Sequence, residues 1–537
     1  MYLGGAVLAR GTQVINGTEY VFEDQPYWDS EKKRGAHKRV YIGKLVDGEF
    51  VPNKRYLLEQ ELAETKKKLQ PGPVPSGKSL RQFYGAVYLL EQIGQTIGVI
   101  QDLKRSFPAT YQQMLSIVYY LILENSPLYR FSKWSRTHKH PYGKDIPSQR
   151  SSELLTTIDE AAKMKFFSLQ AERRLETEFL AFDITSISSY SELIKQVKYG
   201  KNKEGDRLPQ INLALLLGEQ SGLPAYYRKL PGNVSDVKTV TNLLKDITFL
   251  DMDKVKLVMD RGFYSAENIN ALYKHRYKFL IGAKLSLSLV KKKLEEIRGS
   301  LKTRKHYYPE AGLFALSFLD SWPYEEMKPR SGETIRESRR MYFHFYYNDR
   351  KATDDRSRFY HELDAWEEEL SSGHRKPEHE KKYSKYFKVT TTPIRGVKIE
   401  PKQRAIDTAE QNLGYFVLMS NGISKPMEAL QIYRTKDMVE KAFGNLKEHL
   451  NMRRESVASE EGLEGKLFLQ FIGLIYLCHI KKIMDEKKLF SKYSLQELLD
   501  ELDIIELYQH PGKRGYIGEI TGKQRAIYEA MKVAVPT

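Results

Sequence analysis

The sequence predicts an α/β protein whose core is one mixed β-sheet with helices on its faces. Between residues 179 and 282, short apolar segments alternate with helical ones in the order β-β-β-α-β-α-β. The first three strands follow one another as hairpins, whereas the later strands are joined by helices. An antiparallel meander continued by parallel crossover units is therefore expected. The 537-residue chain is long enough for about three or four structural units.

Residues 1–150 are predicted to form a basic, mostly helical N-terminal domain that begins with a β-hairpin. They contain 22 lysines and arginines against 14 acidic residues. Asp47-Gly48 between apolar arms indicates a hairpin at His37–Phe50. A charged helix at 53–69, a Pro- and Gly-rich linker at 71–79 and helices between 80 and 125 follow. We expect this domain to bind DNA.

The first part of the core is expected at 151–284, and the elements there are short and regularly spaced. Strands are predicted at 179–183, 211–217, 224–230, 255–260 and 277–282. Helices are predicted at 236–247 and 265–275.

Residues 285–411 interrupt this alternation of short strands and helices and are interpreted as an inserted domain. Within them, Lys381–Lys388 interleaves four lysines with three aromatic residues, which is typical of a nucleic-acid surface. The core pattern returns at 412–485, with a strand at 415–419, a helix from 433 to 450 and an apolar helix at 465–481. Residues 486–537 are predicted to form a helical tail, and the sequence does not indicate its function.

Composition limits the class of protein. The formal charge is +17 and the pI is near 9.3, and a large basic protein usually has a polyanionic partner, with nucleic acid first. The lone Cys478 excludes a disulfide framework and fits a reducing compartment. The longest apolar runs, 114–123 and 467–477, are shorter than the roughly 18 residues that cross a bilayer. We therefore expect a cytoplasmic protein without a membrane partner.

Two aspartates mark a candidate metal site. Asp183 and Asp260 each follow an apolar strand, and ligands of α/β sheets gather at such strand ends. If the first and fourth strands lie side by side in parallel, the two carboxylates approach one another. Carboxylates are hard ligands that hold Mg²⁺ and leave positions for water and phosphate. A strand-terminal aspartate is also a common cap, so neither residue is diagnostic alone.

A third acid is expected from the helix at 433–450. At 100° per residue, Tyr433, Lys436, Glu440 and Lys447 fall within an arc of about 60° beside the apolar stripe of the helix. This arrangement could direct a carboxylate at a metal and cations at phosphates. A solvated row of charges is the competing interpretation.

Together these residues resemble the DDE transposases of bacterial insertion sequences. The resemblance rests on Phe-Asp183, on PGNVSD at 231–236, on VMDRGFYS at 258–265, and on the spacing Tyr433-x2-Lys436-x3-Glu440-x6-Lys447. It fits the branch whose last motif reads Tyr-x2-Arg-x3-Glu-x6-Lys.

The resemblance implies an RNase H-like core interrupted by a β-rich insertion. It further implies that Asp183, Asp260 and Glu440 are catalytic and hold two Mg²⁺ ions, with Mn²⁺ as a substitute. DNA contacts would come from Tyr433, Lys436, Lys447 and Arg261. The implied partners are double-stranded DNA, as terminal inverted repeats and as target, and a second copy of the chain in a synaptic homodimer.

The sequence departs from this family in two places. Lys436 stands where the family usually has arginine, and an ammonium cannot make the forked phosphate contact of a guanidinium. Arg434 lies about 200° around the predicted helix from Lys436 and is a poor substitute. The strand at 415–419 has no tryptophan to hold an extruded base, so Tyr415 or Phe416 could stack on one instead. Ordinary strand packing is the alternative for both rings.

Two other functions remain open from the sequence. Gly72–Ser79 matches the phosphate-loop pattern G-x4-G-K-[ST], but Pro73 and Pro75 remove backbone donors that such a loop needs. A nucleotide hydrolase acting on nucleic acid is thus the weaker alternative. The other is a transposase-derived DNA-binding protein without catalysis. For the transposase, we expect a bacterial or archaeal, nucleoid-associated location.

Overall fold

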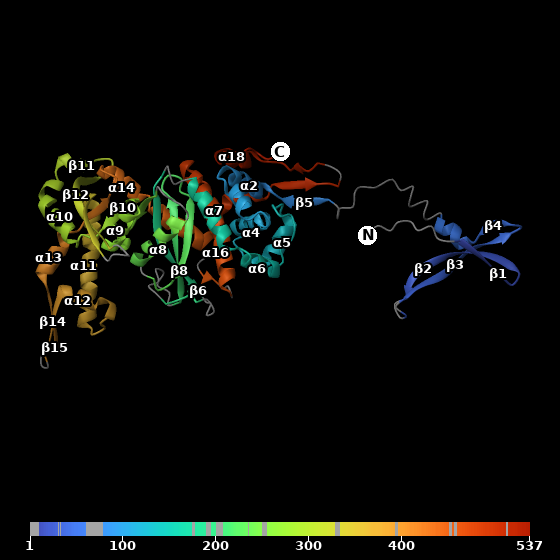
Figure 1. The fold of residues 1–537 in the computed structure, drawn as a ribbon, viewed down its shortest axis with the longest axis horizontal. Helices are drawn as coiled ribbons and strands as arrows, with labels where there is room; N and C mark the ends of the chain where they lie inside the picture. The colour runs from blue at the N-terminus through green and yellow to red at the C-terminus, as the bar shows by residue number, and fades with distance from the viewer. Residues whose placement is uncertain are drawn as a thin grey trace. The chain divides into compact units, whose positions relative to one another are not determined.

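The computed structural model describes residues 10–29, 32, 34–60, 79–173, 178–189, 195–199, 208–234, 236–249, 255–327, 333–392, 396–450, 454–455, 459–511 and 514–537. The chain divides into two compact units (Figure 1). The first comprises residues 1–80 and 509–515, and the second comprises 81–508 and 516–537. The boundary at residue 80 differs from the predicted N-terminal domain of residues 1–150.

The first unit contains a four-stranded antiparallel sheet in the order β1-β2-β3-β4. Its strands are β1 (Arg10–Ile15), β2 (Thr18–Asp29), β3 (Arg34–Val46) and β4 (Glu49–Pro52). Asp47 and Gly48 both have positive φ, 51° and 84°, which a type I′ hairpin turn requires. The hairpin predicted at 37–50 is confirmed. Residues 54–60 are helical, whereas the rest of the charged helix and positions 71–78 of the linker lie outside the described residues.

A ten-stranded mixed sheet forms the centre of the second unit, in the order β11-β12-β13-β16-β10-β9-β6-β7-β8 with β17 beside β6. Its core strands are β6 (Leu180–Ser189), β7 (Gln210–Gly218), β8 (Pro224–Pro231), β9 (Lys256–Met259), β10 (Lys278–Ala283), β16 (Tyr415–Ser420) and β17 (Arg454–Glu455). The pairs β6–β7 and β7–β8 are antiparallel, whereas β9 runs parallel to both β6 and β10. The predicted meander followed by crossover units is confirmed.

The inserted segment contributes strands to this same sheet. They are β11 (Tyr307–Tyr308), β12 (Leu313–Met327) and β13 (Thr334–Tyr347). Because β13 pairs with β16, and β16 pairs with β10, the insertion extends the core sheet at one edge. Prediction from sequence placed these strands in a separate domain, and the long-range pairing with β16 is what joins them to the core.

The rest of the insertion forms a small lobe, residues 349–411, with its own core. It contains α11 (Asp349–Ser371), α12 (Glu380–Tyr386), β14 (Phe387–Thr392), β15 (Gly396–Pro401) and α13 (Gln403–Glu410). Its buried side chains form a cluster apart from the main core: Phe359, Trp366, Leu370, Tyr383, Tyr386, Phe387 and Ile406.

Helices cover both faces of the strands β6 to β8, and all nine residues of β7 are buried. Figure 1 shows α8 (Asp236–Phe249) on one side of these strands, and α7 (Glu160–Glu172) with α16 (Glu460–Glu486) on the other. The remaining helices beside the sheet are α9 (Ala266–Lys274), α10 (Ser288–Leu301), α14 (Pro426–Arg434) and α15 (Asp437–His449).

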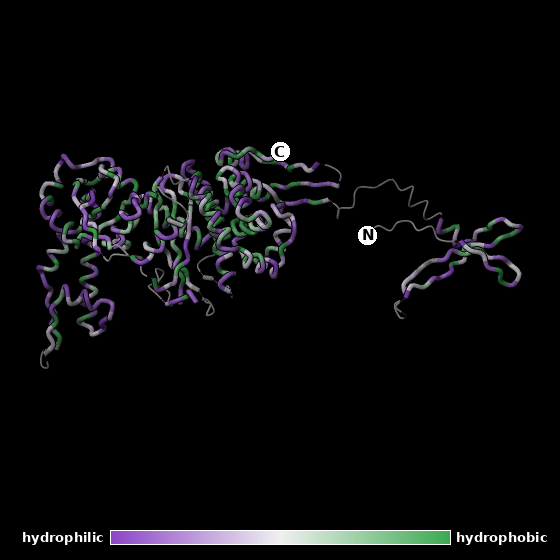
Figure 2. The backbone as a smooth tube through the Cα atoms, viewed as in Figure 1, coloured by the Kyte–Doolittle hydropathy of each residue, from purple (hydrophilic) through white to green (hydrophobic). Residues whose placement is uncertain are grey.

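The helices between residues 85 and 156 share one hydrophobic core with the sheet and α16. They are α2 (Gly85–Thr96), α3 (Val99–Ser106), α4 (Tyr111–Glu124), α5 (Phe131–Thr137) and α6 (Ser148–Thr156). The C-terminal tail packs on them through α17 (Leu495–Asp503) and α18 (Gly522–Ala530), and the Tyr528 hydroxyl donates to the Gly85 carbonyl at 2.9 Å. A small sheet of β5 (Leu80–Phe83), β18 (Glu506–Gln509) and β19 (Tyr516–Ile517) completes the unit. Figure 2 shows apolar segments gathered in the sheet and the helices around it.

One helix of the described chain, α16, is long and apolar enough to cross a membrane. However, 83% of its most apolar window is buried inside the fold. Cys478 lies on this helix and is buried as well. The hydropathy of α16 is thus that of a core helix around which the other helices pack.

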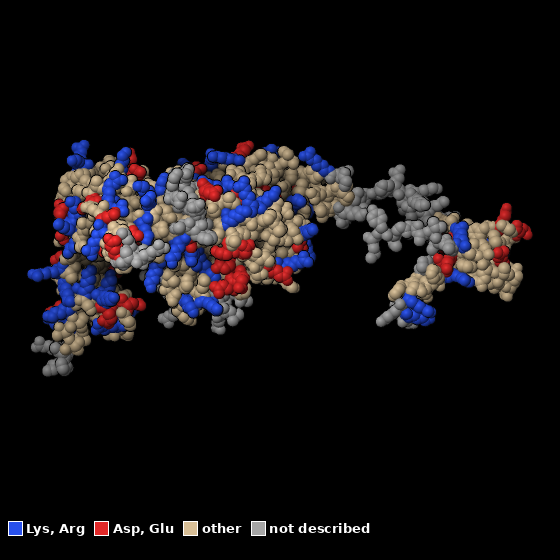
Figure 3. Space-filling model, in the orientation of Figure 1, with Lys and Arg blue, Asp and Glu red and all other residues tan. Residues whose placement is uncertain are grey.

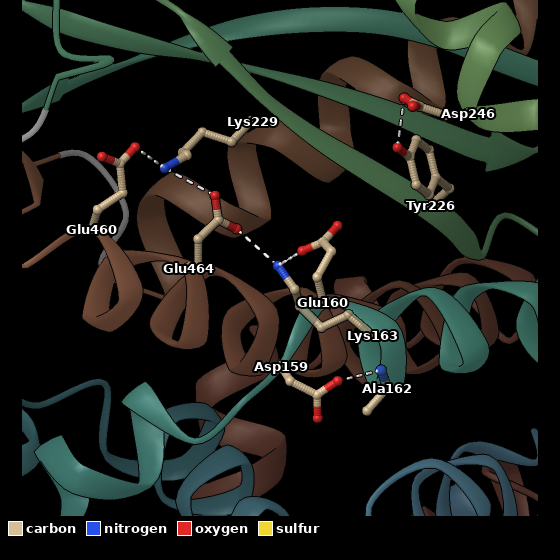
Figure 4. A network of polar contacts seen from close by, with 9 residues as sticks. All are labelled: Asp159, Glu160, Ala162, Lys163, Tyr226, Lys229, Asp246, Glu460 and Glu464. Atoms are coloured by element: carbon tan, nitrogen blue, oxygen red, sulfur yellow. Dashed lines mark hydrogen bonds and ion pairs between the residues drawn. The ribbon is translucent and has the colours of Figure 1, made fainter. Parts of the chain in front are cut away.

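Two buried lysines link α7, β8 and α16 through a network of ion pairs (Figure 4). Lys163 contacts Glu160 at 2.6 Å and Glu464 at 3.0 Å, and its side chain is 4% exposed. Lys229, 3% exposed, contacts Glu464 at 2.9 Å and Glu460 at 3.2 Å. Burial alone would raise the pKa of Glu464, but the two ammonium groups outweigh it and hold this pKa below its usual value. Glu464 therefore bridges two cations taken out of water.

Replacing Glu464 by glutamine should destabilise the second unit by about 3 kcal/mol, because it leaves two buried ammonium groups with one carboxylate each. The depressed pKa means that Glu464 stabilises the fold above the unfolded pKa of about 4.3 and loses this effect as pH falls through the folded value. Urea unfolding, followed by circular dichroism at pH 7 and at pH 3.5, measures the loss of stability and its dependence on pH. The exposed neighbour Glu461 provides the control, since Glu461→Gln should leave the midpoint unchanged; an equal midpoint for both variants at pH 7 would contradict this role.

Candidate active site

The parallel pairing of β6 with β9 places Asp183 and Asp260 next to one another. The register pairs Leu180 with Leu257 and Phe182 with Met259, so the next step along both strands reaches the two aspartates. Neighbouring strands lie about 5 Å apart. The prediction that the first and fourth strands run side by side in parallel is confirmed.

Asp183 does not end its strand, contrary to the sequence expectation. β6 continues to Ser189, whereas β9 stops at Met259, immediately before Asp260. Further along, β6 gains a new parallel neighbour when β17 pairs with Ser188 and Ser189. Asp183 thus lies where β6 loses β9 as a partner, in a gap of the sheet between two neighbouring strands.

Glu440 comes from a helix that is interrupted just before it. The sequence predicts one helix from 433 to 450, but α14 ends at Arg434 and α15 begins at Asp437, with Lys436 as its N-cap residue. Tyr433 therefore lies in the last turn of one helix, and Glu440 in the first turn of the next. Thr435 and Lys436 keep right-handed helical backbone angles across this turn, and the predicted proximity of Tyr433 and Lys436 holds, since the Lys436 ammonium lies 5.5 Å from the centroid of the Tyr433 ring.

Two side chains, those of Tyr433 and Lys436, meet at Asp260. The Tyr433 hydroxyl donates to Asp260 Oδ1 at 2.6 Å, and Lys436 Nζ lies 4.0 Å from the same oxygen. Lys436 Nζ also lies 3.8 Å from Glu440 Oε1. Burial by itself raises the pKa of the Asp260 carboxyl, but the Tyr433 hydrogen bond and the Lys436 charge outweigh it and hold this pKa below its usual value. Asp260 is therefore ionised at neutral pH.

Gly282 of β10 provides the space for this contact. A Cβ at Gly282 would lie 2.9 Å from the Tyr433 hydroxyl and 3.0 Å from the backbone nitrogen of Arg261. The first of these contacts is shorter than real Cβ atoms show. Sequence reasoning missed Gly282, because a glycine near a strand end carries no local signal of a tertiary contact.

A hollow of about 460 Å³ opens beside Asp260, and we call it the active-site hollow. Its lining includes Asp260, Arg261, Lys351, Phe416, Arg434 and Lys436. Arg434 at the end of α14 and Lys436 just before α15 both line this hollow. Lys351 comes from α11 in the lobe and has no sequence motif that would have marked it. The hollow therefore presents several cations next to the carboxylates of Asp260 and Asp437.

The other predicted contacts differ in their exposure. Arg261 is exposed, at the first residue after Asp260. Lys447 is half-buried on α15 and lies seven residues beyond Glu440, about 10 Å along the helix axis. Tyr415 is 5% exposed, and its ring lies 5.0 Å from the Arg298 guanidinium. Phe416 is half-buried and stacks on Tyr346, with ring centroids 4.7 Å apart. Of the two aromatic candidates, Phe416 is the more accessible.

The aromatic residues of the lysine-rich segment in the lobe do not form the surface that the sequence predicted. Tyr383, Tyr386 and Phe387 are 1 to 4% exposed, and they fill the core of the lobe rather than face solvent. Four lysines of the segment are exposed: Lys381, Lys382, Lys385 and Lys388. The alternation reflects an amphipathic helix followed by a strand. Figure 3 shows lysine and arginine side chains gathered over α11 and α12.

The expected metal ligands fit a hard divalent ion in chemistry, but they are not drawn together around one point. Among the described residues, no three His, Cys, Asp or Glu side chains gather closely enough to hold a metal ion. The pair Asp183 and Asp260 is set by the sheet register, and Glu440 joins Asp260 through the ammonium of Lys436. A cation thus already lies between two of the three carboxylates.

Comparisons with known proteins place the chain in a family. The transposase DDE domain family matches residues 174–476, which is more than half of the chain and includes all three acids. No curated protein matches. Among solved structures, a piggyBac transposase synaptic complex with hairpin DNA is similar over 83% of this chain and 74% of that one, at 11% identity. Its TM-score is 0.31, which is too low to support any inference. By the domain match, the chain belongs to the DDE transposase family.

Proposed function

We propose that this transposase cuts DNA at the ends of a mobile element and joins the freed end to target DNA. The observation that carries the proposal is the β6–β9 register, which sets Asp183 beside Asp260. Asp183, Asp260 and Glu440 are the proposed ligands of two Mg²⁺ ions, with Mn²⁺ as a substitute. We also propose that the core is RNase H-like, which the order of its mixed sheet supports.

The chain's own residues prepare this site for the ions. Tyr433 and Lys436 keep Asp260 ionised, so a metal can bind there without displacing a proton. When bound, the ions would supply activation of water or a DNA 3′-hydroxyl and would stabilise charge on the attacking and leaving oxygens. Gly282 keeps the Tyr433 hydroxyl against Asp260 and fixes the carboxylate in one orientation.

The cations of the active-site hollow suit the phosphates that flank the cut. Arg434 can make the forked contact that Lys436 cannot, because a guanidinium donates two parallel hydrogen bonds to a phosphate. Arg261 and Lys351 add charge at the same place. Phe416 lines this hollow, and we propose it over Tyr415 as the ring on which a base could stack.

The first unit is the proposed reader of the element's ends. Its exposed face includes Tyr27 and Trp28, which are 51% and 68% exposed at the end of β2. Figure 3 shows basic side chains at the β2–β3 end of this sheet and acidic ones at the opposite end. A two-stranded β-ribbon fits the major groove of DNA. Exposed aromatic rings beside cations therefore make this end of the sheet suited to duplex DNA.

The lobe offers a second DNA surface of a different kind. With Tyr383, Tyr386 and Phe387 buried, the lobe presents the lysines of this segment, and these contact phosphates without reading bases. We propose that it holds DNA next to the active site independently of sequence. Two copies of the chain would hold the two ends of the element.

Asp183→Asn, Asp260→Asn and Glu440→Gln should each lower strand cleavage by about a hundredfold or more and leave DNA binding nearly unchanged, since each removes a metal ligand and no phosphate contact. Cleavage of a plasmid that carries the element's ends, in Mg²⁺, measures this. Asp437→Asn is the matched control, because Asp437 lines the same hollow outside the triad. A triad variant that cuts at the wild-type rate would remove its residue from the site, and a wild-type protein that binds ends without cutting would favour a DNA-binding role alone.

Trp28→Ala in the full chain should weaken binding to end DNA by about tenfold, as the loss of one stacking or groove contact does. Val14→Ala is the control, since Val14 is 65% exposed on the same sheet. Fluorescence anisotropy with end DNA and with random duplex measures the effect. Equal affinity of both variants for end DNA would move end recognition away from β2.

Lys381→Gln with Lys385→Gln should reduce the slope of log K against log salt by about 1.8, since each phosphate contact contributes about 0.9. The loss should be the same for end DNA and random duplex. Lys291→Gln with Lys292→Gln on α10 removes the same charge elsewhere and should leave the slope unchanged. If both double variants change the slope alike, the lobe makes no specific contribution to DNA binding.

A further inference from the structure

The ammonium of Lys436 lies between two carboxylates that belong to the proposed metal site. Its Nζ is 4.0 Å from Asp260 Oδ1 and 3.8 Å from Glu440 Oε1. It also lies 5.5 Å from the centroid of the Tyr433 ring. The side chain is 24% exposed, so most of it is enclosed by these neighbours.

This position conflicts with a metal ion at the same carboxylates. Mg²⁺ binds oxygens at about 2.1 Å, so Asp260 and Glu440 must approach a shared ion far more closely than they approach the ammonium. A lysine cation and a divalent ion repel one another strongly at such short range. The lack of any three metal-type ligands gathered together among the described residues fits an arrangement in which the lysine holds this place.

The chain offers Lys436 another position. The residue is the N-cap of α15, directly after the break that ends α14, and its long side chain is flexible. It already lines the active-site hollow together with Arg261, Lys351 and Arg434. A DNA phosphate in that hollow would attract the ammonium away from the carboxylates.

We propose that Lys436 is a placeholder cation that neutralises Asp260 and Glu440 until a divalent metal ion displaces it. This inference rests on the proposed function of the site. Metal binding and phosphate binding are thereby coupled: a phosphate that draws the lysine away frees the carboxylates, and an ion that expels the lysine makes it available to phosphate. Coupling of this kind is reciprocal.

The test is Mn²⁺ affinity of the full chain without DNA, measured by electron paramagnetic resonance of the free ion. Lys436→Met keeps an unbranched side chain, one atom shorter, and removes its charge, and it should tighten Mn²⁺ binding by about tenfold, within the usual range of coupling between sites. Lys436→Arg keeps the charge and should bind Mn²⁺ as weakly as the wild type. Lys447→Met is the control, since it removes a charge on the same helix about 10 Å beyond Glu440; it should leave the affinity unchanged.

A random duplex provides the second measurement, since it supplies phosphates without element ends. It should tighten Mn²⁺ binding to the wild type more than to Lys436→Met, because only the wild type has a lysine to release. Unchanged or weaker Mn²⁺ binding by Lys436→Met, with normal melting, would overturn the placeholder role. That result differs from failure of the site itself, in which wild type and Asp260→Asn would have the same Mn²⁺ affinity.

Discussion

The site depends on the parallel pairing of β6 with β9. Because the two strands run in the same direction and in register, the aspartates that follow Phe182 and Met259 lie side by side. A shift of one residue would turn one of them to the opposite face. The apolar residues of both strands, buried on two covered faces, fix this register and with it the distance between the carboxylates.

The break between α14 and α15 is the second determinant. This turn, in which Thr435 and Lys436 keep right-handed helical backbone angles, lies beside a hollow that both Arg434 and Lys436 line together with Asp260. It also lets Tyr433 donate to Asp260 from one helix while Glu440 comes from the next. Gly282 completes the arrangement, because the Tyr433 hydroxyl occupies the space that a side chain on β10 would fill.

Distant parts of the chain hold these elements in place. The helices between residues 85 and 156 and the tail helices α17 and α18 share one core with α16, whose apolar residues are buried almost throughout. Glu464 on that helix binds Lys163 and Lys229 in one network, so α7, the edge strand β8 and α16 are joined by charge as well as by apolar packing. The position of α15 on β6 and β7 follows from this scaffold.

The sequence by itself determined the local elements and the order of the core strands, and it indicated three candidate acids. The period of the hydrophobic pattern and the identity of the turn residues are local signals. The hairpin at Asp47-Gly48 and the strands before Asp183 and Asp260 could therefore be predicted from neighbours in the chain. Motif spacing then identified Glu440, which the family match covers.

Only the tertiary structure decided which of these elements meet. The strands of the insertion join the core sheet because β13 pairs with β16, and residues 81–150 join the core because their apolar faces meet α16. Tyr383 and Tyr386 lie inside the lobe rather than on its surface because α11 and α13 provide the apolar surface that buries them. The contacts of Lys436 and Gly282 likewise join residues far apart in the chain, and such contacts arise from packing between elements, on which local sequence pattern carries no information.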